Sequence, residues 1–285
     1  MTLDRRTVVL AAASLPFATR SIAAAGDPFV ALGQSIGGRL GVAALDTGTG
    51  KRLAHHADER FPMCSTFKLL AAADVLSRVD RGNEKLDRWI AYTKADLLDV
   101  SSITSANVGK GGMTLGALCA AAVEYSDNTA ADLMLATLGG STGATRYVRS
   151  VGDHVTRLDR IEPYANAAIA GDPRDTTAPG AMLADLQAFT LGNALSKESR
   201  GRLTTWLVNC RTLFPRIPAG LPAGWKSGNK MGTGANESTN NVTIVWPPGR
   251  SPILIAAYCR GSAAPRKKIE SGLAEVGRIV AAAFV

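Results

Sequence analysis

The sequence contains few aromatic residues and no dense run of basic residues. Aromatic residues account for 6% of its 285 residues, and the most basic stretch is Arg266-Lys267-Lys268, although the formal net charge is +8. Domains that bind nucleic acids gather basic and aromatic side chains on one surface, so we expect no nucleic-acid partner. A mild positive charge without such a surface suits a small anionic substrate equally well.

The sequence also lacks internal repeats and, after its first residues, any apolar run that resembles a membrane span. Residues 8–18 are apolar but too short to span a bilayer, and they stand between Arg5-Arg6 and the small residues 23–25. This order is typical of an export signal, so we predict that residues 1–25 are removed. The paired arginines favour the twin-arginine route over the general secretory route. We therefore expect a periplasmic protein that is not attached to the membrane.

Cysteine is scarce, and its spacing matches no zinc signature. The four cysteines are Cys64, Cys119, Cys210 and Cys259. Export makes disulfides possible, and an even number of cysteines permits them. However, a chain of this length does not need covalent cross-links, and cysteines in apolar surroundings behave as small buried hydrophobic residues. We predict four unpaired thiols, no metal site and no cofactor.

Histidine is equally scarce, which argues against a serine hydrolase that uses histidine as its base. The three histidines are His55 and His56, beside a predicted turn, and His154, in a polar stretch. None accompanies the G-x-S-x-G sequence of the α/β-hydrolases. We expect all three at the surface.

The hydrophobic patterns predict strands at both ends of the chain and helices in the middle. The predicted elements are a helix over 28–36, strands over 39–46, 51–55, 224–234, 240–246 and 252–260, helical segments between 65 and about 212, and a closing helix over 265–285. In the closing helix, one apolar stripe is formed by Ile269, Leu273, Val276 and Val280. Such a stripe is typical of a helix packed against a core.

This order predicts an α/β (α+β) fold of two lobes, because strands at the two ends of the chain can share one sheet. Residues 26–60 and 217–285 should form an α/β lobe, in which N- and C-terminal helices flank an antiparallel five-stranded sheet. Residues 61–216 should form an all-α lobe with an Ω-type loop over 160–175. Pockets often form between such lobes, so we expect the site there.

The chemistry is organised around Ser65 and Lys68. They open an alanine- and leucine-rich stretch that favours helix, and residues three positions apart share a helix face. The Lys68 amine is therefore expected beside the Ser65 hydroxyl, an arrangement suited to a nucleophilic serine. A capping serine with a solvated lysine would give the same pattern.

Two further motifs have both structural and functional interpretations. Ser126-Asp127-Asn128 lies between two apolar helical segments, either as a cleft loop or as a helix cap. Residues 230–234, Lys-Met-Gly-Thr-Gly, lie in a predicted strand whose glycines permit close approach of a ligand or another backbone. An edge strand with a solvated lysine is the alternative.

The segment over residues 160–177 contains two prolines and a glycine, which exclude a regular helix throughout. Arg160 and Asp175 are expected to pair and to close an Ω-type loop that holds Glu162 over the cleft. An ordinary charged surface loop is the alternative.

Taken together and in this order, the four motifs resemble those of the class A serine β-lactamases, and the resemblance covers essentially all of residues 26–285. It implies the two-lobe fold shared with the penicillin-binding proteins. It also implies a monomeric enzyme that hydrolyses the amide bond of a small-molecule β-lactam through a serine acyl-enzyme.

The resemblance assigns roles in acylation. Ser65 would be the nucleophile, with the backbone N–H groups of Ser65 and Thr233 as oxyanion hole. Lys68, or Glu162 acting through water, would be the acylation base. Ser126 would pass a proton to the lactam nitrogen, supported by Lys230.

It also assigns roles in substrate binding and deacylation. Glu162 and Asn166 would position and activate the water that releases the acyl group. Asn128 would bind the amide of the substrate side chain. Lys230 and Thr233 would bind its carboxylate, and Gly232 would permit close approach.

Several positions depart from the family pattern. Met231 replaces a residue with a hydroxyl group, and Thr239 stands where many relatives have an arginine. Arg216 would then be the alternative arginine that other relatives use; a surface charge is the other interpretation of Arg216. Val100 or Ser101 replaces an aromatic residue at the rim.

Cys64 is shared with some carbapenem-hydrolysing relatives. In those relatives it forms a disulfide with a cysteine four residues after the motif lysine, but in this sequence that position is Gly234. Cys64, Thr233 and Arg216 together suggest a spectrum that includes carbapenems.

Two other functions use similar motifs. A penicillin-binding DD-peptidase or transpeptidase has the same serine and lysine but lacks the deacylating glutamate loop. A non-catalytic β-lactam sensor usually requires a membrane-tethered partner domain.

Overall fold

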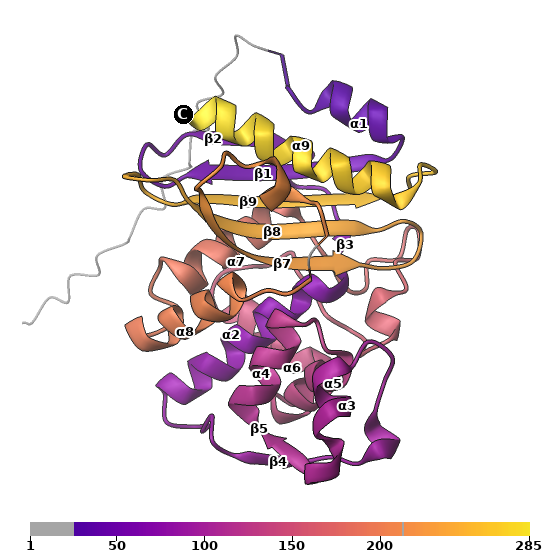
Figure 1. The fold of residues 1–285 in the computed structure, drawn as a ribbon, viewed down its shortest axis with the longest axis vertical. Coiled ribbons are helices and arrows are strands. Elements are labelled where there is room, and N and C mark those ends of the chain that lie inside the picture. The colour runs from indigo at the N-terminus through magenta and orange to yellow at the C-terminus, as the bar shows by residue number, and fades with distance from the viewer. Residues whose placement is uncertain (1–25, 213) are drawn as a thin grey trace, which may run out of the picture.

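The computed structural model describes residues 26–212 and 214–285, so the predicted export signal at residues 1–25 lies outside the described residues. The largest sheet has five strands in the order β2-β1-β9-β8-β7, and every neighbouring pair is antiparallel (Figure 1). Its strands are β1 (Arg39–Asp46), β2 (Arg52–His55), β7 (Lys226–Thr233), β8 (Thr239–Trp246) and β9 (Ile253–Arg260). The predicted antiparallel five-stranded sheet is confirmed.

The two ends of the chain meet in this sheet. Strand β1 pairs with β9 over its whole length, from Arg39 opposite Arg260 to Asp46 opposite Ile253. The helices α1 (Val30–Ile36) and α9 (Arg266–Phe284) cover one face of the sheet (Figure 1). The predicted stripe of α9 is fully buried: Ile269, Leu273, Val276 and Val280. Because burial of one such side chain contributes about 1.5–3 kcal/mol, this stripe attaches the closing helix to the sheet.

The middle of the chain packs against the opposite face of the sheet (Figure 1). Its helices are α2 (Phe67–Asp80), α3 (Ser102–Asn107), α4 (Leu115–Glu124), α5 (Asn128–Thr137), α6 (Ser141–Ser150), α7 (Pro179–Thr190) and α8 (Lys197–Val208). Helix α2 packs against α4, α5, α6 and α8, and every residue from Phe67 to Ser77 is buried. Lys68 therefore lies on the central helix of this part. In the described part of the chain, no helix combines the length and the apolarity needed to cross a membrane.

Five short 3-10 helices connect these elements: η1 (Cys64–Thr66), η2 (Lys94–Asp96), η3 (Val108–Lys110), η4 (Tyr164–Asn166) and η5 (Ile217–Gly220). Two of them matter for the site. The first, η1, leads directly into α2 and packs against β7 and β8, and η4 in turn packs against η1. Segments that are about 100 residues apart in sequence therefore meet at the start of α2.

The prediction that residues 61–216 are all helical is wrong in detail, because two short ribbons lie in this range. Strand β3 (Phe61–Pro62) pairs with β6 (Thr176–Thr177), and β4 (Trp89–Ala91) pairs with β5 (Gly112–Thr114). Strands of two or three residues are too short to show an alternating pattern. Packing defines β4–β5 instead, since a Cβ on Gly112 would lie 2.6 Å from the Trp89 indole nitrogen.

The prediction for the cysteines is confirmed, whereas the prediction for the histidines is wrong for His55. All four cysteines are buried and free, as predicted. The surface position predicted for His55 is wrong: its ring is 7% exposed and packs near Phe29, and its Nδ1 lies 2.5 Å from Asp27 Oδ2. No sequence pattern indicated this contact, because Asp27 comes from a segment before the first strand. His154 is exposed, as predicted.

Gly220 and Gly201 provide a matched test of how α9 is held. A Cβ on Gly220 would overlap the carbonyl oxygen of Ala274 in α9, whereas a Cβ on the helical Gly201 would meet nothing. Gly220→Ala should therefore destabilise the protein by about 1–3 kcal/mol through overpacking. Gly201→Ala should stabilise it by about 0.5–1 kcal/mol through helix propensity. Urea unfolding measures both, and equal midpoints for the two variants would contradict this packing.

Candidate active site

The Lys68 amine is the centre of the site. Its side chain is completely buried, and Nζ lies 3.1 Å from Ser65 Oγ, as the spacing on the helix predicts. It also donates to the Ser126 carbonyl at 2.8 Å and to Asn128 Oδ1 at 2.6 Å. The Glu162 carboxylate, at 3.0 Å, completes its surroundings. One amine thus connects two other segments of the chain, the 126–128 loop and the loop that carries Glu162, to the serine.

The Ser126-Asp127-Asn128 loop is held by its central residue. Asp127 caps α5 by accepting the N–H of Ala130 at 2.9 Å, and it also accepts the N–H groups of Ile103 and Thr104 in α3. The cap interpretation is therefore correct for Asp127. Ser126 has a left-handed backbone, with φ of 58°, which turns it away from the regular helix. Asp127 thus holds the loop while its two neighbours contact lysines.

Strand β7 contributes a second buried lysine. Lys230 is completely buried, and its Nζ donates to Ser126 Oγ at 3.0 Å and to the Met231 carbonyl at 3.0 Å. The solvated-lysine alternative is therefore wrong. Burial, and then the charge of Lys68, lower the pKa of Lys230 to about 7. Burial also lowers the pKa of Lys68, and the Glu162 carboxylate opposes that shift. Each amine is therefore easier to deprotonate than a lysine in water.

The Ω-type loop is closed as predicted, by an ion pair between Arg160 and Asp175. Asp175 also accepts the N–H groups of Asp159 at 2.7 Å and Arg160 at 2.9 Å. The loop places the Glu162 side chain, which is completely buried, beside Lys68. Asn166, in η4, donates its side-chain N–H to the second Glu162 oxygen.

Two glycines let β7 lie close to the segments that carry Ser65 and Asn166. A Cβ on Gly232 would lie 2.7 Å from the Met63 carbonyl. A Cβ on Gly234 would lie 2.6 Å from Cys64 Sγ and 2.7 Å from the Asn166 carbonyl. The close approach is therefore to protein backbone, one of the two alternatives that the sequence left open. Position 234 does face Cys64, but with glycine there Cys64 is a free thiol whose pKa burial raises to about 12.

Arg216 is not a surface charge, because its side chain is completely buried. It donates to the carbonyls of Gly232 at 2.9 Å and Asn240 at 3.0 Å. It also donates to Thr233 Oγ1 at 2.7 Å and pairs with Glu270 at 3.1 Å. Four bonds from one guanidinium fix the end of β7 and orient the Thr233 hydroxyl.

The two rim candidates are distinguished by burial. Val100 is 69% exposed, whereas Ser101 is 5% exposed and its Oγ bonds to Thr129 Oγ1 at 2.8 Å. Only Val100 presents its side chain to solvent.

Three residues that no sequence pattern predicted also support the site. Asp132 Oδ1 accepts the Glu162 N–H at 3.0 Å, and burial raises its pKa to about 6. Asn240 donates to the carbonyls of Pro62 and Met63, and Glu270 pairs with Arg216. A lone acid in the apolar stretch of α5 was the signal for Asp132. Asn240 and Glu270 gave no such signal.

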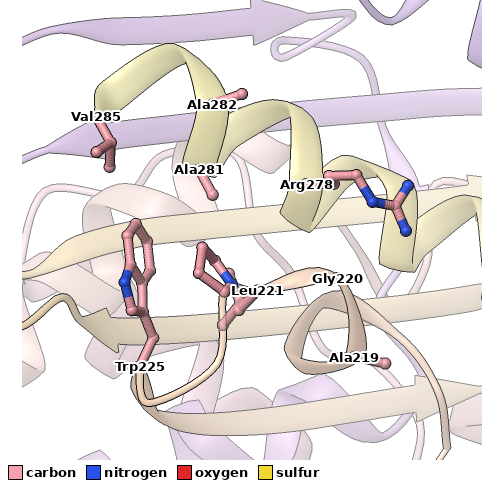
Figure 2. Close-up of a pocket in the computed structure, with 9 residues that line it drawn as sticks. Ala219, Gly220, Leu221, Trp225, Arg278, Ala281, Ala282 and Val285 are labelled. Carbon is pink, nitrogen blue, oxygen red and sulfur yellow. The ribbon is translucent and has the colours of Figure 1, made fainter.

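A groove lies elsewhere, on the α9 side of the sheet (Figure 2). Its volume is about 580 Å³, and Arg278 is its only lining residue with an ionisable side chain. Leu221 and Trp225 face the end of α9 across it (Figure 2). It has neither a nucleophile nor a base.

The antiparallel sheet with helices on both faces and the buried serine–lysine pair define a serine hydrolase of the β-lactamase and penicillin-binding-protein type. A profile of the Beta-lactamase enzyme family matches residues 27–284. The chain is 43% identical to the Carbapenem-hydrolyzing beta-lactamase KPC of Klebsiella oxytoca, over 98% of this chain and 97% of that protein. It is 45% identical to the Beta-lactamase CTX-M-8 of Citrobacter amalonaticus, over 85% of this chain and 81% of that protein.

Solved structures agree with this assignment. The structure named Ancestral (GNCA) Beta-lactamase class A matches with a TM-score of 0.87 and 54% identity, covering 89% of this chain and 97% of that chain. The chain belongs to the class A β-lactamases and is an enzyme that hydrolyses β-lactams. The predicted family and fold are confirmed, and the family assignment replaces the peptidase and sensor alternatives.

The depressed pKa of Lys230 predicts that stability depends on pH. Between about pH 7 and the ordinary value of 10.5, the unfolded chain holds a proton here that the folded protein has released. The stability of the folded protein therefore rises with pH through this window. Below the window, the free-energy cost of burying the charged Lys230 amine is fully present. In urea unfolding, the free energy of unfolding of the wild type should rise by up to about 1.4 kcal/mol per pH unit more than that of Lys230→Met.

Lys226→Met is the matched control, because it removes an exposed lysine from the same strand. It should keep the wild-type slope. Parallel curves for the wild type and Lys230→Met would contradict the depressed pKa.

Proposed function

We propose that Ser65 attacks the β-lactam carbonyl and that its proton passes into the adjacent Lys68–Glu162 pair. The observation that carries this proposal is the 3.1 Å contact between the Ser65 hydroxyl and a buried amine that itself lies 3.0 Å from Glu162. Either Lys68 directly, or Glu162 through water, serves as the base. The backbone N–H groups of Ser65 and Thr233 would stabilise the oxyanion, a contribution that is often the largest single term in such catalysis.

Collapse of the tetrahedral intermediate requires a proton for the lactam nitrogen. We assign its delivery to Ser126, because Lys230 donates to Ser126 Oγ at 3.0 Å and can replenish the proton. Asn128 would bind the amide of the substrate side chain. Lys230 and Thr233 would bind the carboxylate, and Arg216 would act through the Thr233 hydroxyl, which it orients.

Deacylation is assigned to Glu162 and Asn166. Asn166 Oδ1 is a buried acceptor without a hydrogen-bond donor among the described residues, and Glu162 Oε1 is a buried acceptor beside it that has Lys68 Nζ at 3.0 Å and no other donor there. Two such acceptors suit a water molecule, which needs several polar partners. Glu162 would remove a proton from this water as it attacks the acyl carbonyl, and a general base typically contributes about 10²- to 10⁴-fold.

We also assign residues 1–25 to a cleaved export signal, which would place a monomeric enzyme in the periplasm. One lobe would comprise residues 26–60 and 217–285, and the other lobe would comprise residues 61–216.

Replacing the deacylating base separates the two half-reactions. With a chromogenic cephalosporin, the wild type should turn over rapidly, whereas Glu162→Ala should stop after one equivalent and keep a covalent adduct on Ser65. Intact-protein mass spectrometry detects the adduct, and Ser65→Ala should show none. Unchanged turnover by Glu162→Ala would rule out this role for Glu162.

We further propose that the substrates include carbapenems. The support is Arg216, which bonds to Thr233 at the end of β7, together with the 43% identity to a relative named as carbapenem-hydrolysing. The relatives' disulfide is absent, since Cys64 is free, so the proposal does not rest on it.

Imipenem tests this spectrum. The wild type should show steady-state loss of imipenem beyond one equivalent, with Glu162→Ala as a reference that stops at the acyl-enzyme. A wild type that forms only a stable imipenem adduct would contradict the carbapenem proposal and leave the cephalosporin result intact.

A further inference from the structure

A polar hollow outside the active site is lined by residues of α2, of the segment that follows α2, and of α6. Its volume is about 350 Å³, and it is lined by Asp74, Arg78, Arg81, Asn83, Gly143, Arg146, Tyr147 and Ser150. None of these residues belongs to the site around Ser65. The hydrolysis of β-lactams therefore leaves this hollow without a role.

Its charge is strongly positive. Arg81 and Arg146 are exposed, and neither has a carboxylate partner within residues 26–212 and 214–285. Their recorded bonds are to neutral hydroxyls, at 3.0 Å to Ser77 and 3.3 Å to Thr142. The third arginine, Arg78, pairs with the one acid of the hollow.

That acid is Asp74, whose carboxylate lies 3.1 Å from Arg78. Three guanidinium groups therefore face one carboxylate, which gives the lining an excess of two positive charges. The positive charges of Arg78, Arg81 and Arg146 all act on Asp74, so the three arginines lie within electrostatic reach of one point.

Two buried polar groups in the lining have no partner in the described structure. Tyr147 is 6% exposed and Asp74 is 2% exposed, yet Tyr147 Oη and Asp74 Oδ2 make no hydrogen bond there. The Tyr147 ring stacks on Phe189 with centroids 5.5 Å apart, which holds the hydroxyl in place. Buried polar groups are almost always hydrogen-bonded, to protein or to ordered water, so the Tyr147 hydroxyl, a donor, suits an anionic ligand, whereas Asp74 Oδ2, an acceptor, suits a water molecule. Burial raises the pKa of Asp74, and the hydrogen bond from Arg78 and the charges of the three arginines oppose that shift.

We propose that this hollow is a second binding site, which binds a phosphoryl dianion as free phosphate or as a small phosphate ester. Arg81 and Arg146 supply planar donors that match phosphate oxygens in pairs. Arg78 contributes positive charge, because its three nitrogens already donate to Asp74 and to the carbonyls of Thr137 and Leu138. The Tyr147 hydroxyl donates from the buried wall. A dianion balances the two excess charges, and the volume leaves room for a small organic group beside the phosphoryl group.

Isothermal titration at constant ionic strength tests this site with inorganic phosphate as the probe. The wild type should bind one equivalent, and Arg146→Gln and Arg81→Gln should each weaken binding about tenfold or more, as expected for loss of a charged hydrogen bond. Tyr147→Phe keeps the ring and should weaken binding several-fold. Arg202→Gln, which removes an exposed arginine from α8, is the control and should bind as the wild type does.

Glycerol 3-phosphate in parallel titrations distinguishes the two sources. Tighter binding of the ester would identify a phosphate ester as ligand, and equal or weaker binding would identify free phosphate. Absence of binding at millimolar phosphate, or equal weakening in Arg202→Gln and Arg146→Gln, would overturn the proposal. Because Ser65→Ala should bind phosphate unchanged, this result is independent of the hydrolytic mechanism.

Discussion

Burial of the Lys68 amine is the constraint on which the rest of the site depends. An ammonium group without partners is too costly to bury, and here the surrounding segments supply them. Ser65, the Ser126 carbonyl, Asn128 and Glu162 all lie within 3.1 Å of Nζ. Each partner comes from a segment with its own anchor, so displacement of any one would leave a buried charge poorly satisfied.

These anchors hold backbone that is otherwise unfavourable. Cys64 and Ser126, on either side of the lysine, have φ values of 46° and 58°. Such conformations cost about 1–3 kcal/mol each in residues other than glycine. Asp127 caps α5 and binds α3 around Ser126, and Gly234 packs against Cys64. The surrounding packing thus maintains a strained arrangement at the nucleophile, as is common at active sites.

Charge is distributed unevenly around this centre. Two buried lysines lie near Ser126. The charge of Lys68 lowers the tendency of Lys230 to hold a proton, while Glu162 favours the charged form of Lys68. Arg216 is equally buried, but its charge is paired with Glu270 and its donors are used on β7. Arg216 is therefore a positioning residue, whereas the two lysines can donate or accept protons beside the hydroxyl groups of Ser65 and Ser126.

Much of this protein followed from the sequence alone. The order of strands and helices, the buried stripe of α9 and the contact between Ser65 and Lys68 depend on local periodicity, which survives in any arrangement of the elements. The motif order also identified the family. The short ribbons, the buried His55–Asp27 pair and the support from Asp132, Asn240 and Glu270 could not be predicted, because each depends on residues far apart in the chain. Tertiary structure alone decided which charges are buried: Arg216 and Lys230 look like surface residues in the sequence, and only the packing of β7 against the segment before α2 places them inside.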